Sequence, residues 1–173
     1  MNIMLCVPTH IVELDKHTYG EKQVMSRQQH LEAFKDMVSQ WKASRHSVYC
    51  FLDLYEWRRG NFASEADAVA RDWQEVQKAE HVVACPVVHG VSSKGVHIEI
   101  GWATALRRPV TILMETPEAN HANLLMGFKG HPDFDVDLLY YRSDPLTVWD
   151  DLSRRLNGRR GPSKALRFLG PQL

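Results

Sequence analysis

Residues 82–106 read VVACPVVHGVSSKGVHIEIGWATAL and contain the strand-to-helix transition that best indicates the fold. The apolar run 82–85 has the length and β-branched content of a buried strand, and residues 96–106 predict a helix that follows it. Glu99 lies inside that helix among apolar neighbours. Burying a carboxylate costs free energy unless it is paired or used, and such environments are typical of sites of acid–base and nucleophilic chemistry. A helical glutamate at a surface, or paired with an arginine, gives the same pattern.

The alternation of strand and helix extends over the rest of the chain. Four further apolar runs have the length of buried strands, at residues 3–7, 48–52, 110–114 and 138–141. Further helical patterns lie at residues 26–43, 64–79 and 146–156, the second opening with a weak capping-box pattern at 64–67. Alternating strands and helices form right-handed crossovers. The sequence therefore predicts an α/β three-layer sandwich with a parallel sheet of about five strands, flavodoxin- or Rossmann-like.

Length and charge limit the domain organisation and the function classes. The 173 residues are most simply one domain, which we place at residues 1–156. Residues 157–173 form a basic tail containing Gly and Pro, either a solvated end or an arm across a neighbouring subunit. The 21 Lys and Arg balance the 21 Asp and Glu, which argues against electrostatic capture of nucleic acid or an anionic membrane.

The lack of a recognisable targeting signal and the use of cysteine lead us to expect a cytoplasmic protein. The first seven residues lack the basic flank of a signal peptide, and no apolar run approaches the roughly 20 residues of a membrane span. The three cysteines, Cys6, Cys50 and Cys85, each lie in an apolar stretch. We interpret them as small core residues in a reducing compartment, without disulfides.

Two carboxylates are candidates for chemistry at the expected ligand site. Ligands of open parallel sheets bind beyond the carboxyl ends of the strands, so the predicted loops 9–23, 55–63 and 87–94 form the rim of the pocket. Glu99 follows strand 82–85 and Asp72 lies on the helix before it, so the two side chains can meet there. A carboxylate that attacks or stabilises an oxocarbenium-like carbon, with a second that transfers protons, suits a glycosidic reaction. A solvated Asp72 beside Arg71 would have no such role.

A phosphate site is the second candidate feature. Ser92, Ser93 and Gly95 lie at a strand-to-helix junction, where hydroxyls, backbone N–H groups and a helix N-terminus can bind an anion. An N-cap role explains Ser93 equally well. The nine histidines are scattered without a metal-binding spacing, so we expect no metal site. We also expect no cofactor, because in a glycosidic reaction the carboxylate itself stabilises the developing sugar cation.

Together these features resemble the nucleoside 2-deoxyribosyltransferase superfamily. The resemblance is carried by a Gly-x-x-x-Glu-x-Gly-x-Ala motif at residues 95–103, by Asp72 before residues 78–84, and by Arg-Pro-Val at 108–110. It implies that Glu99 is the nucleophile that attacks C1′ of the sugar and that Asp72 assists proton transfer or sugar positioning. The stretch 93–95, Ser-Lys-Gly, is similar to the Ser-x-Gly of the nucleotide-cleaving branch, in which the serine binds the 5′-phosphate. Residues 95–103 look particularly like those of cytidine monophosphate N-glycosidases.

The resemblance also has a departure and implications for the pocket. Family members commonly end the first strand in Gly-Gly-Pro or Ala-Gly-Pro, whereas this chain keeps only Pro8, so the pocket mouth differs. His10 or Tyr19 is expected to supply the stack on the base. Members form homodimers with shared sites, and Asn123, within residues 118–128, is the candidate contribution to the partner's pocket, although a surface loop explains that stretch as well.

The predicted function is hydrolysis of a nucleoside 5′-monophosphate to free base and sugar 5-phosphate through a Glu99 ribosyl–enzyme intermediate, with a pyrimidine, CMP-like nucleotide as the expected substrate. The alternatives are a deoxyribosyltransferase that exchanges bases and a nucleotide-sensing domain without turnover. The family transferases carry an aspartate in the loop before the glycine, where residues 89–94 contain no carboxylate. For the predicted function, the expected partner is a small-molecule nucleotide substrate, with no nucleic acid and no membrane.

Overall fold

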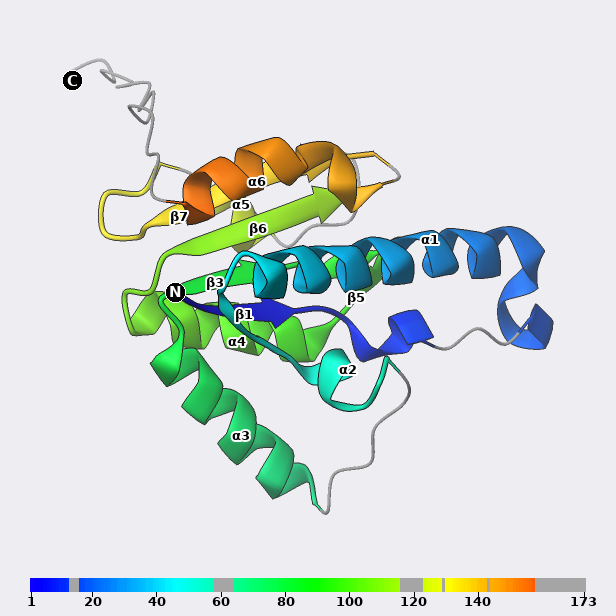
Figure 1. The fold of residues 1–173 in the computed structure, drawn as a ribbon, viewed down its shortest axis with the longest axis horizontal. Coiled ribbons are helices and arrows are strands. Elements are labelled where there is room, and N and C mark those ends of the chain that lie inside the picture. The colour runs from blue at the N-terminus through cyan, green and yellow to red at the C-terminus, as the bar shows by residue number, and fades with distance from the viewer. Residues whose placement is uncertain (13–15, 58–63, 116–122, 129, 143, 158–173) are drawn as a thin grey trace.

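The computed structural model describes residues 1–12, 16–57, 64–115, 123–128, 130–142 and 144–157, with the backbone alone at 16–23 and 123–124. Five parallel strands form the central sheet in the order β2-β1-β3-β6-β7, the flavodoxin-like order (Figure 1). They are β1 (Asn2–Cys6), β2 (Ser47–Cys50), β3 (His81–Ala84), β6 (Val110–Glu115) and β7 (Val136–Tyr141). The predicted three-layer α/β fold and its parallel five-stranded sheet are confirmed.

Helices connect these strands, and a small hairpin follows β3. The α-helices are α1 (Lys16–Ala43), α2 (Phe51–Leu54), α3 (Glu65–Lys78), α4 (Lys94–Ala105), α5 (Asn123–Gly127) and α6 (Trp149–Leu156). Two 3₁₀ turns, η1 (Thr9–Val12) and η2 (Pro145–Val148), come before α1 and α6. The hairpin consists of β4 (Val87–Val88) and β5 (Val91–Ser92).

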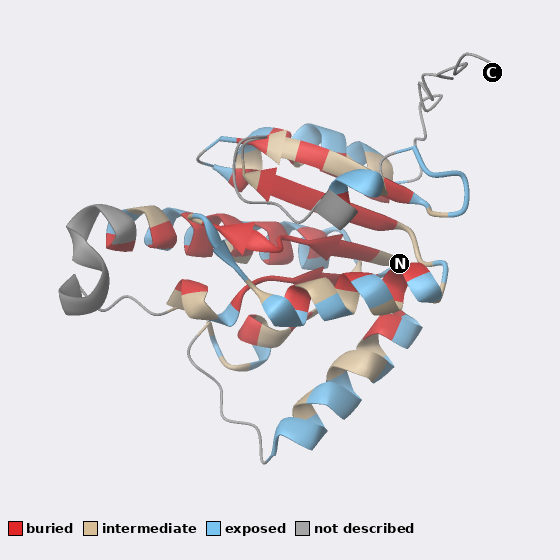
Figure 2. Cartoon of the chain, turned by 180° about the vertical axis from the view of Figure 1, so that it is seen from behind, coloured by how far each residue is buried: buried red, intermediate tan, exposed pale blue. Residues whose placement is uncertain are grey.

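Alternate side chains of the strands pack into two separate cores. In β1, Ile3 and Leu5 join the core under α1 and α6, whereas Met4 and Cys6 join the core under α3 and α4. Figure 1 shows these two helix pairs on opposite sides of the sheet, and Figure 2 shows the central strands β1, β3 and β6 as almost continuously buried. Burial on both faces explains why the strands are near-continuous apolar runs in the sequence.

The prediction of a loop over residues 9–23 is wrong for most of its length. Residues 9–12 form η1, and α1 begins at Lys16, ten residues before the predicted helix. Glu, Lys and Gln at positions 21–23 are good helix formers. The loop was inferred from the polarity of this segment, but polarity does not distinguish a loop from a polar turn of helix.

The predicted strand 48–52 is also too long, because β2 ends at Cys50 and α2 begins at Phe51. Leu52 is fully buried while the Asp53 carboxylate turns toward α1, where Lys42 Nζ lies 2.6 Å from Oδ2. A short apolar run fits a strand and a buried helical turn equally well, so periodicity could not separate them. The third predicted loop, 87–94, contains the β4–β5 hairpin and the start of α4.

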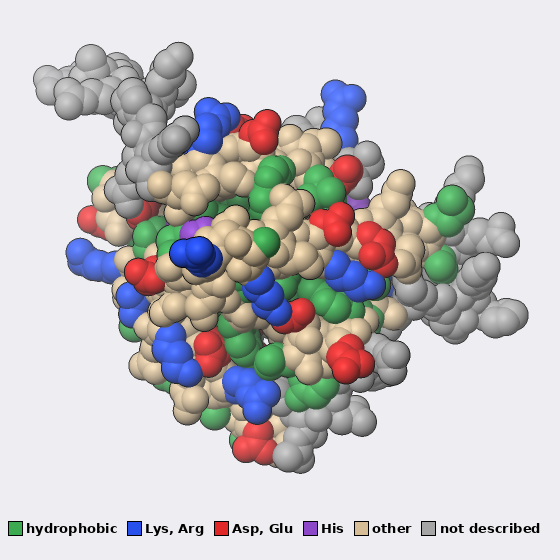
Figure 3. Space-filling view, viewed as in Figure 1, with side chains coloured by type: hydrophobic (Ala, Val, Ile, Leu, Met, Phe, Trp, Pro, Cys, Tyr) green, Lys and Arg blue, Asp and Glu red, His purple; other side chains and the backbone are tan. Residues whose placement is uncertain are grey.

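Surface and core agree with the composition. Figure 3 shows Lys and Arg interspersed with Asp and Glu over the face in view, without a large area of one sign. All three cysteines are free and buried, as predicted. Within the described ranges, no helix has both the length and the apolar character needed to cross a bilayer. The tail from residue 158 onward lies outside the described residues.

Candidate active site

The carboxyl ends of β1 and β3 are the place where the topology of the sheet predicts a ligand crevice. The two strands are neighbours, with Cys6 opposite Ala84 at their ends. After β1 the chain enters α1 on one face of the sheet, and after β3 it enters α4 on the other face. Connections that leave adjacent strands toward opposite faces open a crevice between them, and ligands of doubly wound folds bind there.

Helix α4 carries Glu99 at the border between core and solvent. The helix begins where Ser93 caps it, with Ser93 Oγ accepting the Val96 N–H at 3.4 Å. Ile100 is buried in the core under α3 and α4, whereas Ile98 is 52% exposed, so the intervening Glu99 is partly buried. The Glu99 carboxylate hydrogen-bonds the thiol of Cys6 at the end of β1.

The electrostatic environment of Glu99 favours its protonated form. Burial, with a further contribution from the negative charge of Asp72, raises the pKa of Glu99 from 4.5 to about 8. The Cys6 hydrogen bond opposes this shift without cancelling it. Burial and the neighbouring Glu99 raise the pKa of the Cys6 thiol well above its usual range, so Cys6 is suited to donate a hydrogen bond and not to act as a nucleophile.

Helix α3 brings Asp72 within electrostatic range of Glu99. Asp72 is partly buried, and Tyr49 on β2 donates its hydroxyl to Asp72 Oδ1 at 2.8 Å. Burial raises the pKa of Asp72, while the bond from Tyr49 and the charge of Arg71 act in the opposite direction. The carboxylates stay together because α3 packs on α4, where the rings of Trp73 and Trp102 meet edge to face at 5.5 Å.

The predicted phosphate seat lies where the hairpin joins α4. Ser92 ends β5 and is exposed, and the N–H of Ser93 is bonded to the carbonyl of Pro86 at 2.8 Å. A Cβ built on Gly95 would meet only Ser93 Oγ, at the ordinary distance of 3.9 Å. Packing therefore does not require glycine at position 95, and space beside the helix start stays open.

For the remaining predicted site residues the structure gives the surroundings of only two, Pro8 and His10. Pro8 is buried, and His10 is partly buried with its carbonyl accepting a bond from Arg27 Nη1 at 3.1 Å. The side chains of Tyr19 and Asn123 lie outside the described part of the structure, so the predicted base stack and the shared subunit pocket stay predictions. Among the described residues, no group of three or more His, Cys, Asp or Glu is arranged to hold a metal ion.

The sequence does not indicate the roles of the two residues that bond the candidate carboxylates. The sequence pattern indicates only a strand position for Tyr49 and only a core position for Cys6. The one available signal was polarity inside buried strands, because a buried hydroxyl or thiol normally finds a hydrogen-bond partner. The sequence alone did not show that these partners would be the two candidate carboxylates.

Comparison with known proteins adds information at the level of the fold. No family model matches the chain, and no curated protein matches it. Among solved structures, the CMP N-glycosidase BcmB of Clostridium botulinum superposes with a TM-score of 0.56 at 19% identity, covering 88% of this chain and 99% of its own. The chain shares its fold with a CMP N-glycosidase. A conserved protein from Enterococcus faecalis V583 is similar with a TM-score of 0.53 at 16% identity, covering 90% and 98%.

Proposed function

We propose that the protein hydrolyses the N-glycosidic bond of a nucleoside 5′-monophosphate, giving a free base and a sugar 5-phosphate. The observation that carries the proposal is the pair of carboxylates, Glu99 and Asp72, which interact electrostatically across the α3–α4 contact, with burial raising the pKa of both. The motif at residues 95–103 and the fold shared with a CMP N-glycosidase support the same chemistry.

The first step needs one ionised and one protonated carboxyl group. Glu99 in its carboxylate form attacks C1′ and forms a glycosyl ester. The C1′–N bond breaks with its electron pair on the base, which takes the proton held by Asp72. Water then attacks C1′ and gives a proton to Asp72 while the ester bond returns its electron pair to Glu99. Atoms and charge balance over the two steps, and both carboxyl groups return to their starting state.

The raised pKa values make a shared proton available near neutral pH. Two ordinary carboxylic acids would both be ionised at pH 7, leaving no acid for the base. A pKa of Glu99 near 8 means that the pair keeps at least one proton at neutral pH. Glu99 carries that proton in the free protein, so substrate binding must transfer it to Asp72 before attack. We expect the rate to fall above about pH 8, when the pair loses this proton.

Base release is the direct test. Ribo- and deoxyribonucleoside 5′-monophosphates and the matching nucleosides are incubated with the protein, with Glu99→Ala and with Asp36→Asn, which removes an exposed carboxylate from α1. We expect release from monophosphates, loss of at least about a thousandfold in Glu99→Ala, and no change in Asp36→Asn. Full activity of Glu99→Ala would overturn the mechanism.

The same reactions separate the two alternative functions. A second free base is added to detect base exchange, which would be faster than hydrolysis in a transferase. A nucleotide sensor would show thermal stabilisation by a monophosphate without any product. Mass spectrometry of protein quenched during turnover should find a sugar phosphate attached to Glu99, because the proposed intermediate is an ester.

A further inference from the structure

The β4–β5 hairpin has a strained tip that needs outside support. Its strands pair Val87 with Ser92 and Val88 with Val91, leaving His89 and Gly90 as the two turn residues. Both have left-handed backbone angles, with φ of 53° at His89 and 70° at Gly90, as type I′ turns require. The left-handed conformation costs a non-glycine residue about 1–2 kcal/mol. A histidine at this position therefore indicates that other contacts hold the turn.

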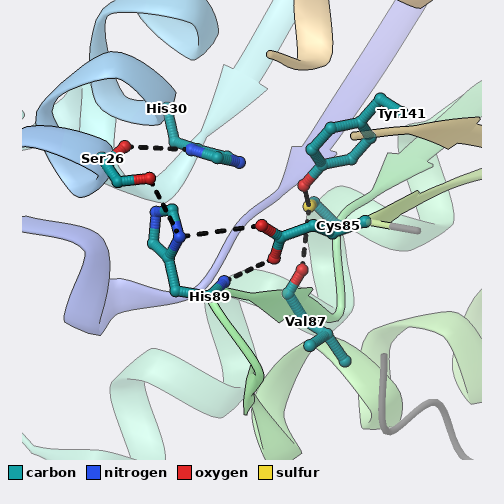
Figure 4. A network of polar contacts seen from close by, with 7 residues as sticks. Ser26, His30, Cys85, Val87, His89 and Tyr141 are labelled. Carbon is teal, nitrogen blue, oxygen red and sulfur yellow. Dashed lines mark hydrogen bonds and ion pairs between the residues drawn. The ribbon is translucent and has the colours of Figure 1, made fainter. Parts of the chain in front are cut away.

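Glu115, the last residue of β6, provides the strongest of these contacts. Its Oε2 accepts the backbone N–H of His89 at 2.6 Å, and its Oε1 lies 3.7 Å from Nδ1 of the same residue (Figure 4). Only 14% of the His89 side chain and 15% of the Glu115 side chain are exposed. A carboxylate that accepts a backbone N–H away from water makes a strong hydrogen bond. This hydrogen bond thereby holds the turn against the carboxyl end of β6.

Helix α1 closes the other side of the turn. Ser26 Oγ lies 3.2 Å from His89 Nδ1, and the ring of His30, which is fully buried, meets the His89 ring edge to face at 4.4 Å. Arg27, between them in sequence, bonds the carbonyl of His10 in the segment that follows β1. One turn of α1 thus contacts both chain segments that leave the crevice strands.

Glu115 does not belong to the catalytic pair, because it lies on the other face of the sheet. Met114 packs in the core under α3 and α4, the side to which Glu99 belongs, and the next residue of a strand points the opposite way. Consistent with this, Glu115 contacts the hairpin, and its charge adds to burial in raising the pKa of the Cys85 thiol, a member of the core under α1.

We infer that Glu115 is a positioning residue that holds the β4–β5 hairpin, and with it the Ser92–Ser93 phosphate seat, against the crevice. The inference rests on the proposed function for the identity of the ligand. Its physical basis is the short connection between the hairpin and α4. Ser92 is the last hairpin residue, and the next residue, Ser93, donates its N–H to the Pro86 carbonyl at the base of the hairpin and caps α4. A hairpin released at its tip would move both serines relative to the α4 N-terminus.

Binding of ribose 5-phosphate, measured by calorimetry, tests this without requiring turnover. Glu115→Ala should weaken binding about tenfold to a hundredfold, the range for a hydrogen bond to a charged group, while Glu115→Gln keeps an oxygen acceptor and should stay within about threefold. Glu80→Ala is the matched control. Glu80 Oε2 also accepts a backbone N–H, that of Asn2 at 2.6 Å, but at the amino end of the sheet.

Kinetics separate positioning from a general loss of structure. In Glu115→Ala the KM for a monophosphate should rise while kcat and the kcat/KM for the matching nucleoside stay unchanged. Wild-type binding by folded Glu115→Ala, or no binding of ribose 5-phosphate by the wild type, would overturn the inference. Binding that depends on Glu115 without hydrolysis of any monophosphate would overturn only the proposed function. Should Glu115→Ala not fold, Ser26→Ala replaces it, with a loss of a few fold expected and unchanged binding counting against the inference.

Discussion

Replacing Glu99 by glutamine should make the protein more stable, and by an amount that depends on pH. In the unfolded chain Glu99 ionises with a pKa near 4.5, whereas in the folded protein burial and Asp72 raise it to about 8. Between these two values the unfolded state gains free energy from ionisation and the folded state does not. The wild type therefore loses stability as the pH rises through this window. Glutamine has nearly the same shape but does not ionise, so the unfolding free energy of the variant does not fall in this pH window.

The size of the effect follows from the two pKa values. Each pH unit between them corresponds to 1.36 kcal/mol, so the difference in unfolding free energy grows from near zero below pH 4.5 to about 3 kcal/mol at pH 7. It levels off near 5 kcal/mol above pH 8, an upper limit because partial exposure of Glu99 lessens the cost of burying its charge. A typical domain has 5–15 kcal/mol in total, so the difference is large enough to measure.

Urea unfolding of both proteins at half-unit steps from pH 4.5 to 9 would measure this difference. The midpoints should coincide at the acid end and separate as the pH rises, with equal m-values showing that the same surface is exposed on unfolding. Asp36→Asn is the control and should follow the wild type at every pH, because it replaces an exposed carboxylate. A gap between Glu99→Gln and wild type that is the same at all pH values, or absent, would refute the assignment of Glu99 as a carboxyl group strained by burial.

Three further substitutions test the groups around the carboxylates. The rate should also fall at acid pH, once both carboxyl groups are protonated and no nucleophile is left. Tyr49→Phe removes the bond that lowers the pKa of Asp72, so this fall should begin at higher pH, whereas Tyr140→Phe should leave it unchanged. Cys6→Ala removes the bond that lowers the pKa of Glu99, so the alkaline limb should also move to higher pH; a shift to lower pH would contradict the contact. Ser93→Asp keeps a side-chain cap for α4, so its stability should stay within about 1 kcal/mol of wild type. The added negative charge should repel a phosphate and raise the KM for monophosphates alone. An equal rise in KM for nucleosides would indicate that Ser93 acts only as a cap.

The sheet was predictable because burial on both faces leaves a strong pattern in the sequence. Strands such as β3 and β6 appear as short apolar runs, and the predicted runs lie within two residues of the observed strands, apart from the helical end of the run at 48–52. The start of α1 and the turn at α2 were missed because their sequences satisfy two local structures equally well. The choice between them depends on tertiary contacts, such as the ion pair between Lys42 and Asp53, that sequence periodicity does not encode.

The candidate site was predictable only where topology or a motif placed a residue. Glu99 and Asp72 could be brought together because one helix enters β3 and the other follows it. Tyr49 could not, since nothing in its strand indicates that its hydroxyl reaches a helix carboxylate 23 residues further along the chain. The support of the hairpin by Glu115 and His89 also joins distant segments, and a positive φ at a histidine leaves no sequence signal comparable to that of a glycine.

Two of the positions that violate the rules of a stable fold are among those to which we assign a role. A partly buried glutamate without a cationic partner among the described residues, and a histidine with positive φ, both lower the stability of the folded chain. At Glu99 the destabilisation corresponds to the proton that the proposed reaction needs, because a fully solvated carboxyl group would have lost it near neutral pH. At His89 the strain is offset by the hydrogen bond to Glu115, the contact to which we assign the positioning of the hairpin. Glu99→Gln should therefore increase stability and abolish activity. Glu115→Ala should instead decrease both stability and affinity for the phosphate. A purely structural origin of the two features would not produce this contrast.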